Sequence, residues 1–270
     1  MNFNAMERHG LVLLGCGRMG SALLAGWLVR GLSPEAVTVI EPRPSEWLQS
    51  QPVRLNADLP EAPAVVVLAV KPQMMAAALP QVARFGQADT LFLSIAAGTT
   101  MATLETALGA DTAIVRAMPN TPAAVGRGIS ALVGNPRAGE GALRMAESLM
   151  AAVGDTLRLE TEAEIDAVTG VSGSGPAYVF HLVEALAAAG EAEGLAPDVA
   201  MRLARATVSG AGHLLEHSPE TAAQLRANVT SPGGTTAAGL VHLMDPETGL
   251  PPLMRRTVGA SADRSRELAK

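Results

Sequence analysis

The first half of the chain alternates short apolar runs with segments whose apolar residues recur at helical spacing. The run Ala64–Val70 is continuous and rich in valine, which is typical of a parallel strand covered on both faces. Helical spacing over Met19–Arg30 ends at Gly31, a common stop signal. The expected strands are Gly10–Leu14, Val37–Ile40, Ala64–Val70, Thr90–Ile95, Ala113–Ala117, Ile129–Val133 and Thr156–Leu159, and the expected helices between them are Met19–Arg30, Gln73–Ala83, Met101–Leu108 and Gly141–Val153. This alternation predicts an α/β fold with a parallel, doubly wound sheet.

From about Thr161 helical periodicity dominates and strand-like runs disappear. We therefore predict an α/β domain over residues 1–160 and an all-helical domain over residues 161–270. The expected helices are Ala177–Glu193, Pro197–His217, Pro219–Asn228, Ala237–Met244 and Pro251–Lys270. Pro176 and the glycines before it interrupt a helical pattern, which predicts a break or kink there.

A glycine-rich motif, G-x-G-x-x-G, lies at Gly15–Gly20 between the first strand and the first helix. Gly15 allows a tight turn, Gly17 lets a pyrophosphate approach the backbone, and Gly20 lets the helix lie close to the sheet. The helix start then offers free N–H groups to the anion. Its position at the first strand-to-helix turn favours dinucleotide binding over a plain structural turn. Cys16, inside the loop, is expected to be a small filler.

Two charged residues near the end of the second strand bear on the choice of cofactor. Glu41 follows the last glycine by about 20 residues, where an acid binds a ribose 2′-hydroxyl and favours NAD. Arg43 is placed to bind the 2′-phosphate of NADP instead. Both residues are also compatible with a solvated loop, so the sequence leaves the choice between NADH and NADPH open.

The composition of the chain argues against several classes of binding partner. The chain has 270 residues, a net charge of −6, one cysteine and only two lysines, Lys71 and Lys270. An acidic chain without a basic stripe is not expected to bind nucleic acid, and the dispersed histidines, with His213 and His217 read as helix-surface residues, predict no metal site. The longest apolar run is far shorter than the roughly 20 residues of a membrane span, so we expect no membrane partner and a cytoplasmic location.

Lys71 directly follows the buried strand Ala64–Val70. Ligands of such sheets bind beyond the carboxyl ends of the strands, so Lys71 is expected in the cofactor crevice, although a solvated loop lysine is the plainer alternative. Ala97 lies at the end of the next strand, where small side chains would admit a flat ring.

A second glycine-rich turn, Ser231-Pro232-Gly233-Gly234-Thr235-Thr236, precedes a helix-compatible stretch. Such a turn supplies unpaired N–H donors and hydroxyl groups, which suit a carboxylate or a phosphate. An ordinary helix cap is an equally good reading of this segment alone.

Together these motifs resemble pyrroline-5-carboxylate reductase. The similarity covers nearly the whole chain. The matching stretches are Gly15–Gly20, Ala69–Pro72, Ser94–Gly98, Arg116–Ala123, Asp166–Phe180 and Asn228–Thr236. The resemblance implies reduction of L-1-pyrroline-5-carboxylate to L-proline by NADPH or NADH, the last step of proline biosynthesis. It also implies an N-terminal Rossmann domain and dimerisation through the C-terminal helical domain, giving a homodimer or a decamer of dimers.

The resemblance assigns roles to individual residues. Thr236 is expected nearest the ring nitrogen, as the catalytic residue, with Ser231, Gly234 and Thr235 completing the substrate site. The expected cofactor contacts are Gly15, Cys16, Gly17, Arg18, Met19, Gly20, Glu41, Arg43, Asn56, Ala69, Val70, Lys71, Pro72, Ala97, Glu162 and Asn228. Many relatives carry a small polar residue where this chain has Glu41, which bears on NADP preference.

Two other functions are compatible with parts of the pattern. A hydroxyacid dehydrogenase of the same layout would resemble its relatives in using a lysine of the helical domain as an acid, and this domain has only Lys270. A catalytically silent nucleotide-binding sensor would keep Gly15–Gly20 but would have no need for the Ser231–Thr236 turn.

Overall fold

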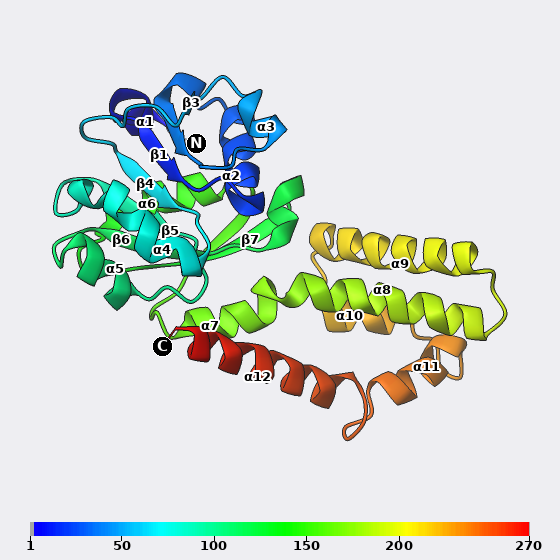
Figure 1. Ribbon diagram of the computed structural model, residues 1–270. Coiled ribbons are helices and arrows are strands. Elements are labelled where there is room, and N and C mark those ends of the chain that lie inside the picture. Colours follow the sequence, from blue (N-terminus) through cyan, green and yellow to red (C-terminus); the bar gives the residue numbers. More distant parts are fainter. Residues whose placement is uncertain (1–2, 270) are drawn as a thin grey trace. The chain divides into compact units, whose positions relative to one another are not determined.

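The computed structural model describes residues 3–269. They form two compact units (Figure 1). The first contains residues up to 173 together with residues 261–269, and the second contains residues 174–260. Residues 161–173 and the end of the last helix thus belong to the same compact unit as the sheet. The functional domain boundary at residue 160 stays a prediction.

The first unit is built on one eight-stranded sheet of order β3-β2-β1-β4-β5-β6-β7-β8. Its strands are β1 (Leu11–Leu14), β2 (Val37–Ile40), β3 (Arg54–Leu55), β4 (Val65–Leu68), β5 (Leu91–Ser94), β6 (Ile114–Met118), β7 (Gly128–Gly134) and β8 (Gly154–Arg158). Strands β1 to β6 run parallel, as expected of a Rossmann-type fold. The predicted fold class is confirmed.

The expectation of parallel strands throughout is wrong at one edge of the sheet. Strand β7 pairs antiparallel with β6, and β8 then pairs parallel with β7. Residues 119–127 join β6 to β7 and hold only the 3-10 turn Thr121–Val125. A parallel return needs a crossover of about a dozen residues or more, so this short link forces the chain to reverse.

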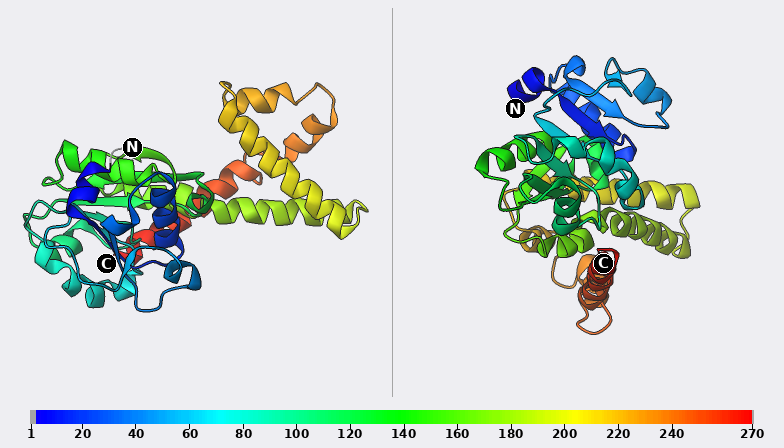
Figure 2. Two further views of the ribbon diagram at one scale, coloured as in Figure 1. Left: turned by 90° about the horizontal axis from the view of Figure 1, so that it is seen from above. Right: turned by 60° about the vertical axis from the view of Figure 1, so that its left-hand side comes forward.

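Helices cover both faces of the sheet, which gives three layers (Figures 1 and 2). Alternate residues of each strand face opposite layers: Leu11 and Leu13 join one buried cluster, and Val12 and Leu14 join the other. The first cluster contains side chains of α1 (Asn4–His9), α2 (Arg18–Val29), α3 (Glu46–Gln49) and α6 (Glu140–Met150). The second contains side chains of α4 (Pro72–Ala78), α5 (Met101–Leu108) and α7 (Glu164–Val168).

One expected helix is shorter than the sequence predicted. Helix α4 ends at Ala78, and a 3-10 turn, Leu79–Gln81, follows it where the sequence predicted a helix to Ala83. Pro80 lies in that turn, and a proline has no N–H to continue the helical hydrogen bonds.

The second unit is entirely helical. It contains α8 (Gly175–Ala192), α9 (Pro197–His217), α10 (Ala222–Asn228), α11 (Thr235–Leu243) and the first part of α12 (Leu250–Leu268). Helix α8 packs along α9 (Figure 1). The break predicted at Pro176 is confirmed, because a π-helical segment, Thr169–Gly173, precedes α8 and Pro176 lies in the first turn of α8.

Candidate functional site

The glycine loop connects β1 to α2 in a conformation that needs glycine at two positions. Gly15 has a φ of 90°, and a Cβ there would lie 2.8 Å from the Cγ1 of Val70. A Cβ on Gly20 would lie 2.7 Å from the carbonyl oxygen of Gly15. Gly17, by contrast, borders open space, and a Cβ at this position would meet nothing within 4 Å. The loop therefore closes tightly at its base and leaves room beside Gly17 for a ligand.

Helix α2 begins directly after Gly17, and no side chain caps its first turn. The first N–H groups of a helix have no partner within the helix, and the helix dipole places partial positive charge there. An anion held beside Gly17 would therefore meet donors that nothing else in the loop satisfies. These features fit the pyrophosphate of a dinucleotide.

Glu41 lies beyond the end of β2 and its carboxylate reaches back to the glycine loop. Oε2 accepts a hydrogen bond from the N–H of Cys16 at 2.9 Å, and Oε1 accepts one from the N–H of Arg43 at 3.0 Å. Both carboxylate oxygens are thus held by main-chain donors. The sequence predicted Glu41 near the cofactor but gave no sign of this direct link to the loop.

Asn56, at the end of β3, holds the backbone of Glu41. Its Oδ1 accepts from the N–H of Glu41 and its Nδ2 donates to the carbonyl oxygen of Glu41, both at 2.9 Å. Asn56 has a φ of 50°, a left-handed conformation that asparagine tolerates better than most residues. The side chain that the resemblance placed beside the cofactor is therefore occupied in fixing Glu41.

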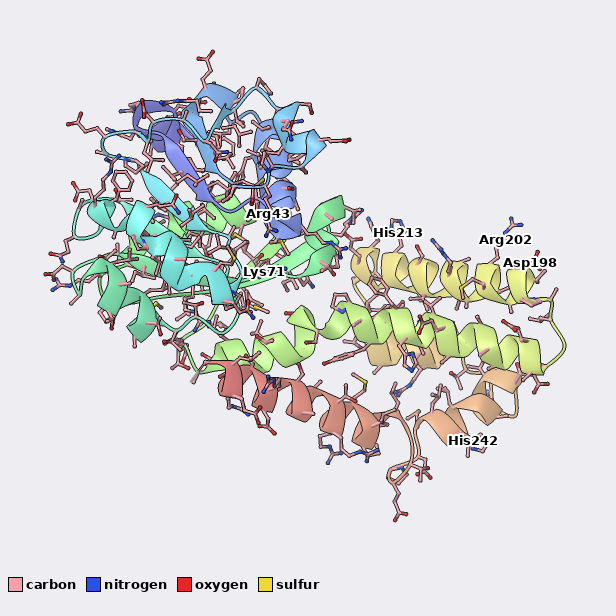
Figure 3. All side chains as sticks on the ribbon, in the orientation of Figure 1. Arg43, Lys71, Asp198, Arg202, His213 and His242 are labelled. Atoms are coloured by element: carbon pink, nitrogen blue, oxygen red, sulfur yellow. The ribbon has the colours of Figure 1, made fainter. Side chains whose placement is uncertain are left out.

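A cleft of 430 Å³ opens where the strands β1, β2 and β4 end. Gly15 and Gly17 line it from the loop, Glu41 and Arg43 from the end of β2, and Lys71 from the end of β4. Ala69 and Val70 complete the wall beside Lys71. Figure 3 labels Arg43 and Lys71 in this unit. The structure thus brings together charged residues that lie far apart in the sequence and were predicted separately.

Lys71 precedes α4 as its N-cap residue, and Pro72 occupies the first helical position. Its backbone φ and ψ of −64° and 147° are extended, and proline at the start of a helix favours that geometry in the residue before it. The local sequence therefore fixes the backbone of Lys71 at the rim of the cleft. A flexible ammonium group at such a rim suits attraction of phosphate oxygens.

Cys16 is almost fully buried, and its Sγ lies 3.5 Å from the Oγ of Ser21. Burial raises the pKa of the thiol, with the charge of Glu41 acting in the same direction and the hydrogen bond to Ser21 opposing it. A raised pKa lowers the thiolate fraction at neutral pH, so the thiol is a poor nucleophile. This agrees with the expected filler role.

Nine of the sixteen predicted cofactor contacts do not line the cleft: Cys16, Arg18, Met19, Gly20, Asn56, Pro72, Ala97, Glu162 and Asn228. Ala97 is exposed just beyond the carboxyl end of β5, the neighbour of β4. The carboxylate of Glu162 accepts from the N–H of Met101 at 2.6 Å, at the start of α5, and pairs with the buried Arg116. This ion pair ties β6, α5 and the segment before α7 together, and sequence reasoning did not find it.

In the second unit, the Ser231–Thr236 turn leads into α11, whose N-cap is Gly234. No side chain caps the nine-residue helix, so its first N–H groups are free for an anion. Gly233 has a φ of 71°, and a Cβ on Gly234 would lie 2.4 Å from the Oγ of Ser231. Thr235 and Thr236 are both exposed. The geometry suits a carboxylate ligand with hydroxyl groups beside it.

Asn228, predicted as a cofactor contact, ends α10 in the same unit. Its Nδ2 donates to the Oε1 of Glu220 at 2.7 Å.

His213 and His217 lie exposed on α9, as the sequence predicted, and Figure 3 labels His213. Together with Glu216, they bring side-chain atoms that could coordinate a metal ion within 4.8 Å of one another. The prediction of helix-surface histidines did not include this grouping.

Comparison with known proteins decides the family. The chain is 38% identical to the pyrroline-5-carboxylate reductase of Pseudomonas aeruginosa over 271 residues, covering 98% of both chains. It is 40% identical to that of Synechocystis over 267 residues, covering 96% of this chain and 98% of the relative. This chain belongs to the pyrroline-5-carboxylate reductase family.

Family models match this reductase-family chain in two places. Residues 162–268 match pyrroline-5-carboxylate reductase dimerisation, and residues 10–98 match NADP oxidoreductase, coenzyme F420-dependent. The second match contains the glycine loop together with Glu41, Arg43 and Lys71 of the cleft. The resemblance drawn from the sequence is confirmed.

Solved structures of the reductase family have the same fold. A pyrroline-5-carboxylate reductase from Coxiella burnetii is 32% identical, with a TM-score of 0.89, and covers 97% of this chain and 99% of its own. The Plasmodium falciparum enzyme, solved with NADP bound, is 27% identical with a TM-score of 0.81, covering 98% of this chain and 100% of its own. Within residues 3–269 of the present family member, no helix combines the length and apolar character of a membrane span.

Proposed function

We propose that this chain reduces L-1-pyrroline-5-carboxylate to L-proline by hydride transfer from NAD(P)H. The observation that carries the proposal is that identity to reductases of this family extends over 96–98% of the chain, through both compact units. A protein that shared only nucleotide binding would match in the first unit alone. The match therefore includes the glycine loop and also the Ser231–Thr236 turn, where the sequence predicts the substrate.

The residues of the first unit fit a nicotinamide dinucleotide. Gly17 leaves open space beside uncapped helix-start N–H groups, and Glu41, Arg43 and Lys71 line the same cleft. In the proposed site the loop Gly15–Gly20 holds the pyrophosphate and Lys71 attracts phosphate oxygens. When bound, the cofactor supplies a hydride from its nicotinamide ring.

The second unit is proposed to orient the substrate, a cyclic imine that carries a carboxylate. Free N–H groups at the start of α11 suit the carboxylate, with Ser231 and Thr235 beside it. In the proposed site the hydroxyl group of Thr236 hydrogen-bonds the ring nitrogen, which takes up a proton from solvent, and the neighbouring carbon gains the hydride from the nicotinamide. A protonated imine is already a strong hydride acceptor, so the main task of the protein is alignment.

The helical unit is also proposed to form a homodimer. Its own buried cluster contains only Ala187, Ala200 and Ala204, with Val183 packed against it. An apolar groove of 530 Å³ between α8 and α9 is lined by Val179, Phe180, Met201 and Val208 among others. Apolar surface of this kind is typical of an interface that a second chain covers. Assembly into a decamer of dimers and a cytoplasmic location stay part of the proposal.

Oxidation of NADH and of NADPH with pyrroline-5-carboxylate as the second substrate tests the activity directly. We expect turnover with formation of proline, and light scattering should give at least twice the 27.7 kDa chain mass. Folded protein that binds nucleotide without turnover on this imine would instead support the sensor alternative.

A further inference from the structure

Glu41 carries a negative charge at the point in the fold where the cofactor's adenosine ribose is recognised in Rossmann-type sheets. The side chain cannot readily turn away from that point. Its Oε2 is held by the N–H of Cys16 at 2.9 Å and its Oε1 by the N–H of Arg43 at 3.0 Å. Cys16 is only 5% exposed, so turning Glu41 away would leave a buried N–H without its acceptor.

Asn56 fixes the backbone that carries this carboxylate. Its amide group makes a reciprocal pair of 2.9 Å hydrogen bonds with the N–H and carbonyl oxygen of Glu41. The Glu41 side chain is thus held at both ends, by Asn56 at its backbone and by two main-chain N–H groups at its carboxylate. A rigid anion recognises one charge pattern and does not adapt to another.

A ribose 2′-hydroxyl and a 2′-phosphate present opposite chemistry to a carboxylate. The hydroxyl donates a hydrogen bond to one of the remaining lone pairs of Glu41. A phosphate near neutral pH offers acceptor oxygens and close to two negative charges, so it gains no such bond and is repelled. Arg43 lines the same cleft and its guanidinium forms no ion pair among the described residues, so Arg43, like Lys71 in that cleft, would favour the phosphate.

We propose that Glu41, held in place by Asn56, makes this protein select NADH and reject NADPH. The inference rests on the proposed function for the identity of the cofactor, and it deepens that function by naming which form binds. Glu41 acts on the bound nucleotide directly, and Asn56 is a positioning residue. The repulsion from Glu41 outweighs the attraction of Arg43 because Glu41 is fixed by four hydrogen bonds, whereas ordering the Arg43 side chain costs conformational entropy.

Binding of nucleotide fragments tests the proposal without any turnover. Calorimetric titration of the whole chain with ADP-ribose and with 2′-phospho-ADP-ribose gives two dissociation constants. We expect ADP-ribose to bind about tenfold more tightly or better, and we expect the ratio to shrink as salt rises from low to physiological ionic strength, because salt screens the repulsion. If wild-type protein bound the two fragments equally, or bound 2′-phospho-ADP-ribose more tightly, that measurement by itself would overturn the proposal.

Two substitutions test whether Glu41 and Asn56 determine the ratio of the two dissociation constants. Glu41→Gln removes the charge and keeps the shape, and should bring the ratio close to one. Asn56→Gly removes the amide but keeps the left-handed backbone accessible, and should bring the ratio part of the way while the melting temperature changes little. Glu46→Gln, an equal change of charge at an exposed residue of the nearby α3, is the matched control and should leave the ratio unchanged. A ratio that moves equally in Glu41→Gln and Glu46→Gln contradicts a specific role for Glu41.

The two proposals fail in different ways. A protein that prefers ADP-ribose but does not turn over pyrroline-5-carboxylate leaves the selection by Glu41 intact and removes the proposed function. A protein that reduces the imine equally well with NADH and NADPH, and binds both fragments equally, keeps the function and removes the selection.

Discussion

The two units of this chain differ in how they bury their apolar side chains. In the first, the central strands β1, β4 and β5 are almost completely buried between two helical layers, and large side chains such as Trp27 and Phe92 are fully enclosed. In the second, large apolar side chains face outward and the buried cluster is built on alanine. Phe180 is 63% exposed and Leu203 is 52% exposed. The first unit is closed on itself, whereas the second needs another surface.

The difference extends to the candidate site. The cleft of the first unit is shaped by backbone and by residues already held by hydrogen bonds, as Glu41 is by Cys16 and Arg43. The Ser231–Thr236 turn of the second unit offers free donors on an exposed helix start. The cleft is thus formed by the fold of the first unit, whereas the turn lies on a surface of the second unit that is open in the single chain. Four experiments test this comparison.

The largest effect should come from charging the apolar face of the helical unit. Phe180→Asp together with Leu203→Asp should make the chain monomeric and abolish nearly all activity, because a buried unpaired charge opposes the interface. Light scattering and the reductase assay measure both. Val29→Asp, at an 86% exposed valine in the first unit, is the matched control and should change neither. An active dimeric double variant would refute the contrast between the units.

The next effect distinguishes the cleft of the first unit from the turn of the second by their kinetics. Thr236→Ala should lower kcat by about a hundredfold, the usual cost of one well-placed donor to a reacting group, and should change KM for the nucleotide little. Lys71→Ala should instead weaken nucleotide binding by roughly tenfold and leave kcat largely intact. Steady-state kinetics with both substrates varied distinguish them. Negligible effects of both substitutions would remove these assignments.

A third, smaller effect tests the glycine loop with a pair of identical substitutions. Gly20→Ala places a Cβ 2.7 Å from the carbonyl oxygen of Gly15 and should lower the free energy of unfolding by about 1–3 kcal/mol. Gly17→Ala meets nothing within 4 Å and should leave stability unchanged while weakening nucleotide binding. Chemical denaturation and calorimetric titration measure the two quantities. Equal loss of stability in both variants would contradict the open space beside Gly17.

The smallest effect concerns the surface ion pairs that Arg158 forms with Glu140 and Glu147 in the first unit. Hydrogen bonds from Arg158 hold the pKa values of Glu140 and Glu147 below their ordinary value near 4.5. A lowered pKa in the folded state stabilises the fold above that ordinary value, and the contribution is lost as the pH falls through the lowered values. Arg158→Gln should therefore slightly lower the melting temperature at pH 7 and approach wild type in acid.

Arg30→Gln, which removes an exposed charge elsewhere in the same unit, is the control for that pH series. Its difference from wild type should not follow the same acid profile. A difference between Arg158→Gln and wild type that persists unchanged below the lowered pKa values would exclude these ion pairs as its cause.

Much of the fold could be predicted because its signals are local. The glycines of Gly15–Gly20 and the valine-rich run of β4 each carry their own pattern, and helix α9 has the bounds that Pro197 and its periodicity predicted. The reversal at β7 was missed because apolar patterns indicate a strand but not its direction. Strand β3 was missed because it has only two residues, too few for a pattern.

Sequence reasoning could bring strand-end residues of the candidate site together but could not find the hydrogen bonds that support them. Glu41 and Lys71 were both expected in the cofactor crevice because parallel strands share one carboxyl edge, and both line the cleft, while their binding of a cofactor stays a prediction. The bonds from Asn56 to Glu41 and from Glu162 to Met101 join segments far apart in the chain and depend on side-chain direction. Neither leaves a pattern in a single sequence.

Helix α12 has a consequence for the order in which the protein is made. The helix starts in the helical unit, but residues 261–269 belong to the sheet unit, where Ala262 is buried and the Oγ of Ser265 donates to Asp166 at 2.6 Å. The ribosome therefore releases the sheet, then the helical insertion, and last the short piece that completes the first unit. A nascent chain can begin to assemble its sheet early, but it completes that unit only after the helical residues 174–260 have been synthesised.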